Sequence, residues 1–385
     1  KMMRCASTSL KFANTCKINA LGVFLAEYRR VVGVFIDQIW DDTPKGSFLK
    51  DSSVESNLSA RAKQCAAKQA LAIVQGTKKK FNSRAFVIEK LKKEGDDEKA
   101  QRLQAIQDKA RVSKPSLDKI NAELDSRFVK MALGADIKTA KGFDIWLTIG
   151  SLGTSKKVTF PVRRNKLFNR WLAKASLRPS IRLTDKDIVF FFEYEPKKAE
   201  GKTLGVDLGS RKVLSASDGQ QTPTDRNGWT MPKIQKRLAA RKKGSVGFKK
   251  TDAHRNNFIR WSIAQLNFTN VGEIKLESLK GMNKGKRLNR HRQAWNYRDI
   301  IGAVERKCEE LGVQVSYVRP QYTSQRCCKC GWVEESNRKA ERFSCKQCGF
   351  SGNADINAAC NIALGGAYSP SDPKNVNTAS LPFFT

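Results

Sequence analysis

The chain has 385 residues, which is enough for two or three domains with sizeable cores. Its 72 Lys and Arg residues exceed its 37 Asp and Glu residues, and the formal net charge of +35 predicts a polyanionic partner, of which nucleic acid is the usual one. A membrane surface is the competing partner, but no apolar run approaches the ~18 residues that a spanning helix needs, and the longest, ALGVFLA, is typical of a helix core.

The first third of the chain is mainly helical. TSLKF at residues 8–12 alternates and predicts an opening strand. The helical pattern then runs from about Asn14 to Asn121, with an Ala-rich helix at 59–74 and charged helices at 85–93 and 98–112. A charged helix face is often only solvated surface, but the net charge favours a helical lobe that grips nucleic-acid backbone.

Around Arg127 the period of the hydrophobic pattern changes to two. Strands are predicted at 143–150, 157–162, 180–183 and 188–195, with turns at 152–154 and 184–186. These strands predict a small antiparallel barrel or sandwich that the opening strand joins. The predicted divisions are therefore a β-barrel at 1–13 and 125–200 and an inserted helical lobe at 14–124, followed by a linker, KKAEGK, at 197–202.

The second half opens with TLGVDLGS at residues 203–210, which predicts a strand. Its apolar face consists of Leu204, Val206 and Leu208. Asp207 stands on the other face between Gly205 and Gly209, where the missing side chains let bulky groups approach it.

A long basic helical segment is predicted from about Pro232 to Phe268, and KRLAARKK within it is a candidate backbone-contacting patch. EIKLESL at 273–279 predicts a second strand with Glu277 on the face opposite Ile274 and Leu276. KGKRLNRHR at 284–292 is the densest basic run and predicts a loop. The candidate nucleic-acid contacts are Lys236, Arg237, Arg241, Lys286, Arg287, Arg290 and Arg292.

The end of the chain predicts two helices and a strand. Ile301, Val304, Cys308 and Leu311 mark one face of a helix that ends at Gly312, and a strand is predicted at 313–318. A final helix has its apolar stripe at Ile356, Ala359 and Ala363. Residues 365–385 are rich in Gly, Asn, Ser and Pro and predict a disordered tail.

Two CxxC pairs, Cys327/Cys330 and Cys345/Cys348, predict a metal site. Each pair offers two thiolates from a tight turn, and two such turns make a closed tetrahedral zinc site of the structural kind. Disulfides are the alternative, which the lack of a secretory signal and the other cysteines disfavour. We assign a zinc ribbon to residues 321–350, in which the extra Cys328 leaves open which thiols ligate.

Three carboxylates are candidate catalytic residues: Asp207, Glu277 and Asp355. Each alone has a structural explanation, as a strand-end acid, a surface acid and a first-turn helix acid favoured by the dipole. Histidine-based catalysis is disfavoured, since the chain has only two histidines. Three converging acids repel one another unless cations neutralise them, and oxygen ligands suit Mg²⁺ or Mn²⁺. A pair of such ions ~4 Å apart supports phosphodiester hydrolysis, so the sequence predicts a nuclease in which Asp207 bridges both ions.

Three segments resemble the RuvC motifs of the TnpB family, whose members are transposon-encoded and related to compact type V CRISPR effectors. They are GVDLGS around Asp207, KLESL around Glu277 and the composite YTSQRCCKCG…FSCKQCGFSGNADINAA, and the resemblance extends over about 204–364, including Trp295. It implies an RNase H-like (RuvC) nuclease domain at 201–320 and 351–364 with the zinc ribbon inserted before the last catalytic helix. The barrel and the helical lobe correspond to the family's wedge and recognition lobe by layout alone.

The resemblance implies an RNA-guided DNA endonuclease with a guide RNA, a double-stranded and single-stranded DNA target, one structural Zn²⁺ and two Mg²⁺ or Mn²⁺ ions at Asp207, Glu277 and Asp355. In such enzymes base pairing reads the target. A DNA-binding repressor with an idle nuclease is a second possibility, which the complete acid set disfavours. A guide-free, structure-specific RuvC-type nuclease is a third, which the large N-terminal half disfavours. We expect a prokaryotic, cytoplasmic, nucleoid-associated protein that binds a guide RNA as a monomer or a dimer.

Overall fold

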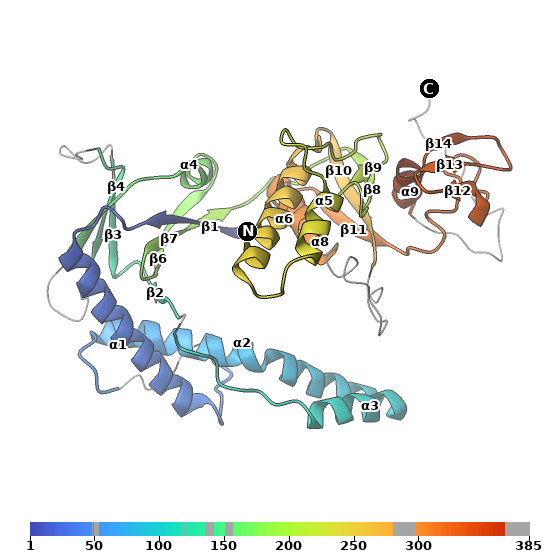
Figure 1. Ribbon diagram of the computed structural model, residues 1–385. Coiled ribbons are helices and arrows are strands. Elements are labelled where there is room, and N and C mark those ends of the chain that lie inside the picture. Colours follow the sequence, from blue (N-terminus) through green and yellow to red (C-terminus); the bar gives the residue numbers. More distant parts are fainter. Residues whose placement is uncertain are drawn as a thin grey trace. The chain divides into compact units, whose positions relative to one another are not determined.

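The computed structural model describes residues 1–47, 49, 54–118, 120–134, 142–150, 157–279 and 297–365 (Figure 1). Two compact units, Lys1–Glu195 and Pro196–Thr385, each have their own hydrophobic core. Both units combine helices with sheets, so the predicted multidomain α+β class is confirmed. Among the described helices, none is both long and apolar enough to cross a membrane. The predicted tail at 365–385 lies, except for Gly365, outside the described residues.

Unit 1 contains two antiparallel sheets. The first has the strand order β1-β7-β6-β2 and the second the order β3-β4-β5. Their strands are β1 (Met2–Ser9), β2 (Ala122–Leu124), β3 (Val129–Leu133), β4 (Ile145–Ile149), β5 (Val158–Val162), β6 (Ser176–Leu183) and β7 (Asp187–Tyr194). The turn between β6 and β7 lies where it was predicted, and the Thr184 hydroxyl there accepts hydrogen bonds from the N–H groups of Lys186 and Asp187. The turn predicted at 152–154 lies outside the described residues.

The opening strand begins earlier than predicted, at Met2 instead of residue 8. Its inward-facing residues include Ala6 and Thr8, which are buried but only weakly hydrophobic, so the alternation is faint in the sequence. Leu10 lies just beyond the strand, where its N–H donates to the carbonyl of Lys186.

Four helices complete the described part of unit 1. They are α1 (Thr15–Ile39), α2 (Ala60–Lys93), α3 (Asp97–Asp108) and α4 (Lys166–Leu172). The predicted helices at 59–74 and 85–93 are one continuous helix, α2, which ends where Gly95 adopts a φ of +76°. The sequence did not predict α4, because a seven-residue helix is too short to show a period; Asn165 caps it and Phe168 and Trp171 are buried.

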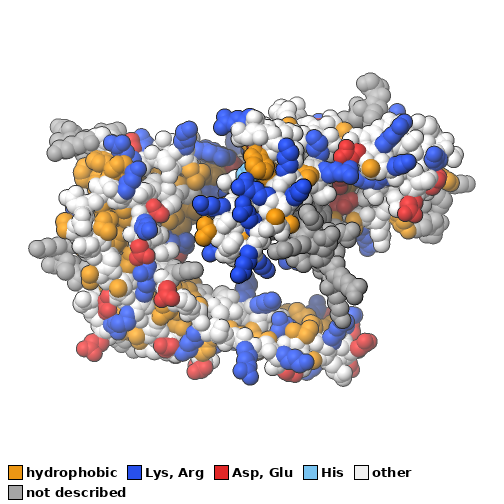
Figure 2. Space-filling view, viewed as in Figure 1, with side chains coloured by type: hydrophobic (Ala, Val, Ile, Leu, Met, Phe, Trp, Pro, Cys, Tyr) orange, Lys and Arg blue, Asp and Glu red, His pale blue; other side chains and the backbone are white. Residues whose placement is uncertain are grey.

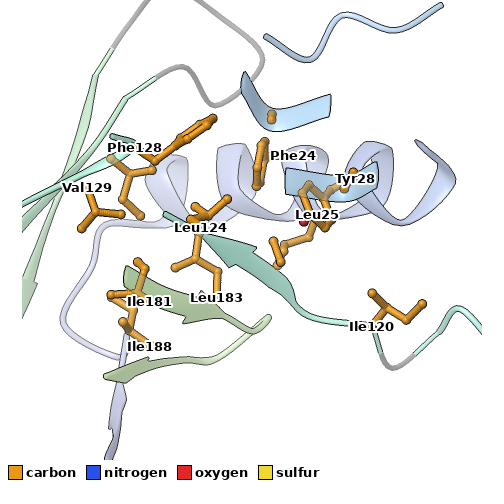
Figure 3. Packing of buried hydrophobic residues seen from close by; sticks show 14 of the residues in the cluster. Phe24, Leu25, Tyr28, Ile120, Leu124, Phe128, Val129, Ile181, Leu183 and Ile188 are labelled. Atoms are coloured by element: carbon orange, nitrogen blue, oxygen red, sulfur yellow. The ribbon is translucent and has the colours of Figure 1, made fainter. Parts of the chain in front are cut away.

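Helix α1 contributes to the core of unit 1 (Figure 3). Phe24, Leu25 and Tyr28 of α1 belong to the same buried cluster as Leu124 of β2 and Leu183 of β6. All of these residues are almost fully buried. The hydroxyl of Tyr28 donates a hydrogen bond to Gln69 of α2. Helices α1–α3 lie in the chain between β1 and β2, which belong to the same sheet, so the helical segment is an insertion between two strands of that sheet.

Unit 2 is built on a four-stranded sheet with the order β11-β10-β8-β9. The strands are β8 (Lys202–Asp207), β9 (Ser215–Ala216), β10 (Val271–Glu277) and β11 (Gln314–Val318). β8, β10 and β11 are parallel, and β9 runs antiparallel to β8. Val206 pairs with Leu276, so Asp207 and Glu277 follow at neighbouring positions on the same edge of the sheet.

The described helices of unit 2 are α5 (Met231–Ala239), α6 (Val246–Ala264), α8 (Tyr297–Leu311) and α9 (Ala354–Ala363). The basic segment predicted as one helical stretch is divided into α5 and α6 near Gly244, which has a φ of +85°. In α8 the predicted face is confirmed at Val304 and Cys308, which are buried.

The predicted apolar stripe of α9 is confirmed only in part. Ala359 is fully buried, but Ile356 and Ala363 are half-buried, and Ala358, Cys360 and Ile362 outside the stripe are buried as well. The reason is that α9 contacts β8, β9 and β10 on one side and the small sheet of β12 (Arg338–Lys339), β13 (Arg342–Ser344) and β14 (Ser351–Asn353) on another. The short 3₁₀-helix η2 (Glu335–Asn337) precedes β12.

Gly205 lets α9 pack directly on β8. A Cβ atom at this position would lie 2.0 Å from the carbonyl oxygen of Ala359 and 2.4 Å from the nitrogen of Ala363. The space beside Gly205 was predicted to admit groups that approach Asp207, and that prediction is wrong, because the backbone of α9 fills the space. At Gly209 a Cβ would likewise meet the carbonyl oxygen of Lys212 at 2.6 Å.

We expect Gly205→Ala to destabilise unit 2 by about 3 kcal/mol, since a methyl group cannot fit without moving the backbone of α9. Gly302→Ala is the matched control, because Gly302 lies inside α8 and its Cβ would meet only the flexible end of Arg306, at 3.2 Å. That change should be neutral or stabilising by up to ~1 kcal/mol. Urea unfolding of the full chain measures both variants, and equal midpoints would contradict the packing role of Gly205.

Candidate active site and metal cluster

The four cysteines of the two CxxC pairs come together in one cluster. Their sulfur atoms all lie within 4.8 Å of one another, and the Sγ–Sγ distances are 3.7 Å for Cys327–Cys348 and 3.5 Å for Cys330–Cys345. All four are free thiols. Four sulfurs ~2.3 Å from a central ion in tetrahedral geometry stand about 3.8 Å apart, so the cluster fits a tetrahedral metal ion.

Cys328 lies outside this cluster. Its backbone N–H donates to Oδ1 of Asn357, 3.0 Å away, and its thiol interacts with the thiol of Cys360 on α9, which raises the pKa of Cys328. The side chain is buried between the cysteine cluster and α9. The sequence left open which thiols of this segment would bind the metal ion. The structure favours Cys327 and Cys330, because Cys328 lies outside the cluster.

The three candidate carboxylates come together at one edge of the main sheet. Asp207 ends β8, Glu277 ends β10, and Asp355 stands in the first turn of α9. Asn353 starts that helix, since its Oδ1 accepts hydrogen bonds from the N–H groups of Asp355 and Ile356. The negatively charged carboxylate of Asp355 therefore lies near the positive end of the helix dipole.

The carboxylates share one electrostatic environment. Burial, followed by the negative charges of Glu277 and Asp355, raises the pKa of Asp207 to about 7. Burial also raises the pKa of Glu277. The Asp207 side chain is largely enclosed by protein atoms, yet part of its surface remains accessible to solvent. A cation that reaches the acids would therefore stabilise their charged forms.

Arg338 adds a positive charge to the site from β12. Its Nη2 lies 2.7 Å from Oδ1 of Asp355, and its charge lowers the pKa values of Asp207 and Glu277. No pattern in the sequence singled out this residue, because it is one of many basic residues and lies far from the other acids in the chain. One guanidinium beside three carboxylates leaves an excess of negative charge.

The donor set fits hard divalent cations. Carboxylate oxygens are the ligands that Mg²⁺ and Mn²⁺ prefer, and the excess negative charge would be neutralised by them. Three carboxylates offer several oxygen ligands, which is what two ions ~4 Å apart would need.

The predicted nucleic-acid residues are only partly described. Lys236 and Arg237 lie in the last turn of α5 and Arg241 follows it, all three with exposed side chains. Figure 2 shows Lys and Arg side chains gathered over the face that carries α5 and α6. Lys286, Arg287, Arg290 and Arg292, and also Trp295, lie outside the described residues.

Comparisons with known proteins relate the chain to one group of nucleases. The family of the Cas12f1-like TNB domain matches residues 297–362. The CRISPR-associated endodeoxyribonuclease Cas12f1 of Sulfoacidibacillus thermotolerans is 33% identical over 172 residues, which are 44% of this chain and 40% of the relative. A TnpB-like protein of Aquifex aeolicus (strain VF5) is 39% identical over 104 residues, which are 24% of this chain and 34% of the relative.

The fold has a solved counterpart. The mini RNA-guided endonuclease CRISPR-Cas phi3 superposes with a TM-score of 0.57 and 12% identity, over 94% of this chain and 92% of that chain. The chain spans about two fifths or less of the length of the two curated relatives. The comparisons confirm the resemblance to the TnpB family and to compact type V CRISPR effectors.

We expect Asp207→Asn to make the metal-free protein more stable than the wild type at pH 8. The ordinary pKa of this carboxyl is 3.8, and it is about 7 in the folded protein, so the folded state holds the proton more tightly. The free energy of unfolding of the wild type therefore falls as the pH rises from about 4 to 7, by up to ~4 kcal/mol from this group.

Thermal unfolding without added divalent ions, from pH 4 to pH 8, measures this difference. It should vanish near pH 4, where both proteins carry an uncharged group at position 207. Asp42→Asn, which replaces an exposed acid of unit 1, is the control for a charge change outside the site. Parallel profiles for Asp207→Asn and the wild type would contradict the raised pKa.

Proposed function

We propose that the chain is an RNA-guided DNA endonuclease that hydrolyses phosphodiester bonds with two divalent ions held by Asp207, Glu277 and Asp355. The observation that carries the proposal is the convergence of these acids at one sheet edge from three segments that lie far apart in the chain. A relative that shares 33% identity with part of the chain is named an endodeoxyribonuclease.

Each acid has a separate task in this proposal. The charges of both Glu277 and Asp355 act on Asp207, so Asp207 would be the ligand that both ions share, and Glu277 and Asp355 would each help to hold one ion. Two Mg²⁺ or Mn²⁺ ions would supply an activated water and stabilisation of the leaving oxygen. Arg338 offsets part of the repulsion among the acids and offers a donor to a phosphate oxygen.

The four-cysteine cluster holds one structural zinc ion in this proposal. Four thiolates leave no open position, so the ion stabilises the small sheet of β12–β14 instead of acting on substrate. That sheet supplies Arg338, and α9 with Asp355 follows it directly in the chain.

The proposed domain roles rest on topology. Parallel β8, β10 and β11 with antiparallel β9 support an RNase H-like nuclease domain at 201–320 and 351–364, with the zinc ribbon at 321–350. In unit 1, the insertion of α1–α3 between two strands of one sheet supports a wedge barrel with an inserted recognition lobe. The proposed boundaries are 1–13 with 125–200 for the barrel and 14–124 for the lobe, although β2 (Ala122–Leu124), at the end of the lobe's range, pairs with β6 of the first sheet.

The proposed partners are a guide RNA and target DNA. The charge of +35 favours a large polyanion as partner, and the exposed residues Lys236, Arg237 and Arg241 suit contacts to phosphates. CRISPR-Cas phi3, whose fold is similar, is an RNA-guided endonuclease. In such enzymes base pairing supplies the sequence specificity, and the protein contacts the backbone of the heteroduplex.

Asp207→Ala tests the proposed function. The variant, purified with its RNA, should keep target binding and lose Mg²⁺-dependent cleavage by orders of magnitude, because both ions lose a shared ligand. Leu204 and Val206 of the same strand are unchanged, so the fold should persist. Asp218→Asn is a control on a turn away from the site. Cleavage at the wild-type rate by Asp207→Ala would overturn the assignment.

Elemental analysis tests the zinc site. We expect about one zinc ion per chain in protein purified without added metal, and its loss in Cys345→Ser together with a lower thermal midpoint. Cys328→Ser is the matched control, since Cys328 is a buried neighbour outside the cluster and should retain the zinc. Zinc loss in both variants would contradict the ligand assignment.

A further inference from the structure

Glu277 has a partner that the proposed mechanism does not use. The hydroxyl of Thr323 donates a hydrogen bond to Oε1 of Glu277. The carbonyl of Pro320 is the competing acceptor, 3.2 Å from the same hydroxyl, which lies closer to Glu277. A hydroxyl has one proton, and a carboxylate is the stronger acceptor, so the bond fixes one oxygen of Glu277.

Thr323 is itself held by the helix that carries Asp355. Nδ2 of Asn361 on α9 donates to the carbonyl of Thr323, at 2.9 Å, and to the carbonyl of Arg326, at 2.7 Å. Carbonyl oxygens only accept, so the amide must present its nitrogen to this segment. Oδ1 of Asn361 is buried and has no partner among the described residues. A buried acceptor without a partner is unfavourable, and an apolar side chain would avoid it but would lose both donors.

Asn357, one turn earlier on the same face of α9, holds the next part of the segment. Its Nδ2 donates to the carbonyl of Arg326 at 2.8 Å, and its Oδ1 accepts from the N–H of Cys328 at 3.0 Å. Asn357 and Asn361 are both 1% exposed, and Thr323 is 4% exposed. Two buried amides therefore bind α9 to residues 323–328, between β11 and the cysteine cluster.

We propose that Thr323 is a positioning residue for Glu277, and that Asn357 and Asn361 hold it so that α9 sets the positions of Glu277 and Asp355 together. The inference rests on the proposed function, because positioning matters only if these acids bind divalent ions. Partners that orient a metal ligand typically change metal affinity 10- to 100-fold when they are removed.

Mn²⁺ binding to the full chain, with its zinc retained and nucleic acid removed, tests the inference by titration calorimetry and electron paramagnetic resonance. Thr323→Val keeps the shape and removes the donor, and its Mn²⁺ affinity should fall about tenfold with little change in the thermal midpoint. Thr323→Ser keeps the hydroxyl, and it should bind Mn²⁺ like the wild type even if loss of the methyl group lowers the midpoint. If Thr323 had only a structural role, Mn²⁺ affinity would follow the thermal midpoint in both variants.

Thr251→Val is the matched control, since the buried Thr251 hydroxyl donates to the carbonyl of Gly247 in its own helix and has no other hydrogen bond within the described part of the chain. It should leave Mn²⁺ affinity unchanged. Asn361→Leu should lower the affinity as Thr323→Val does, and wild-type affinity in that variant would overturn the role of Asn361.

Two outcomes separate this inference from the proposed function. If the wild type binds Mn²⁺, Asp207→Ala does not, and Thr323→Val binds as tightly as the wild type, then Thr323 does not position Glu277 and the proposed function stands. If the wild type binds no more Mn²⁺ than Asp207→Ala does, the proposed function fails and the inference fails with it.

Discussion

The contact between α9 and β8 at Gly205 is the constraint on which the candidate site depends. A strand and a helix normally keep their backbones apart with side chains, but here the missing Cβ brings Ala359 and Ala363 onto the strand. The close approach lies two residues before Asp207 on the strand and four residues after Asp355 on the helix. Two acids that are distant in the chain therefore come within electrostatic reach through backbone packing.

The clustering of the three acids lowers the stability of the ion-free protein and favours the binding of a divalent cation. Burial and like charges raise the pKa of Asp207 to about 7, so the ion-free fold pays for holding its acids together at neutral pH. The Arg338–Asp355 ion pair offsets part of that repulsion. A divalent cation would offset the rest, and the same repulsion that weakens the empty site is then the driving force for binding the ion.

The sequence predicted what depends on local patterns and on spacing. The strands that carry Asp207 and Glu277, the start of the helix at Asp355 and the two CxxC turns all have short-range signals. Contacts between distant segments have none. The burial of Cys360 and Ile362 around most of α9, the reach of Arg338 to Asp355, and the bond from Thr323 to Glu277 are set by tertiary packing. The same holds for Gly205: the sequence predicts the space left by its missing side chain, but not that the backbone of α9 fills this space.

The cysteine cluster lies beside the acids because the segments around it also carry the partners of the acids. The sheet of β12–β14 has a small core, with Phe343, Ala354 and the cysteines themselves as its buried members, too little apolar area to fold alone. In the proposed function, a tightly bound ion would add the missing free energy of folding. Arg338 comes from this sheet, residues 323–328 lead into it, and α9 leaves it. An ion that orders the sheet would therefore also order the partners of Glu277 and Asp355, and a structural metal would influence the acids through the chain that connects them.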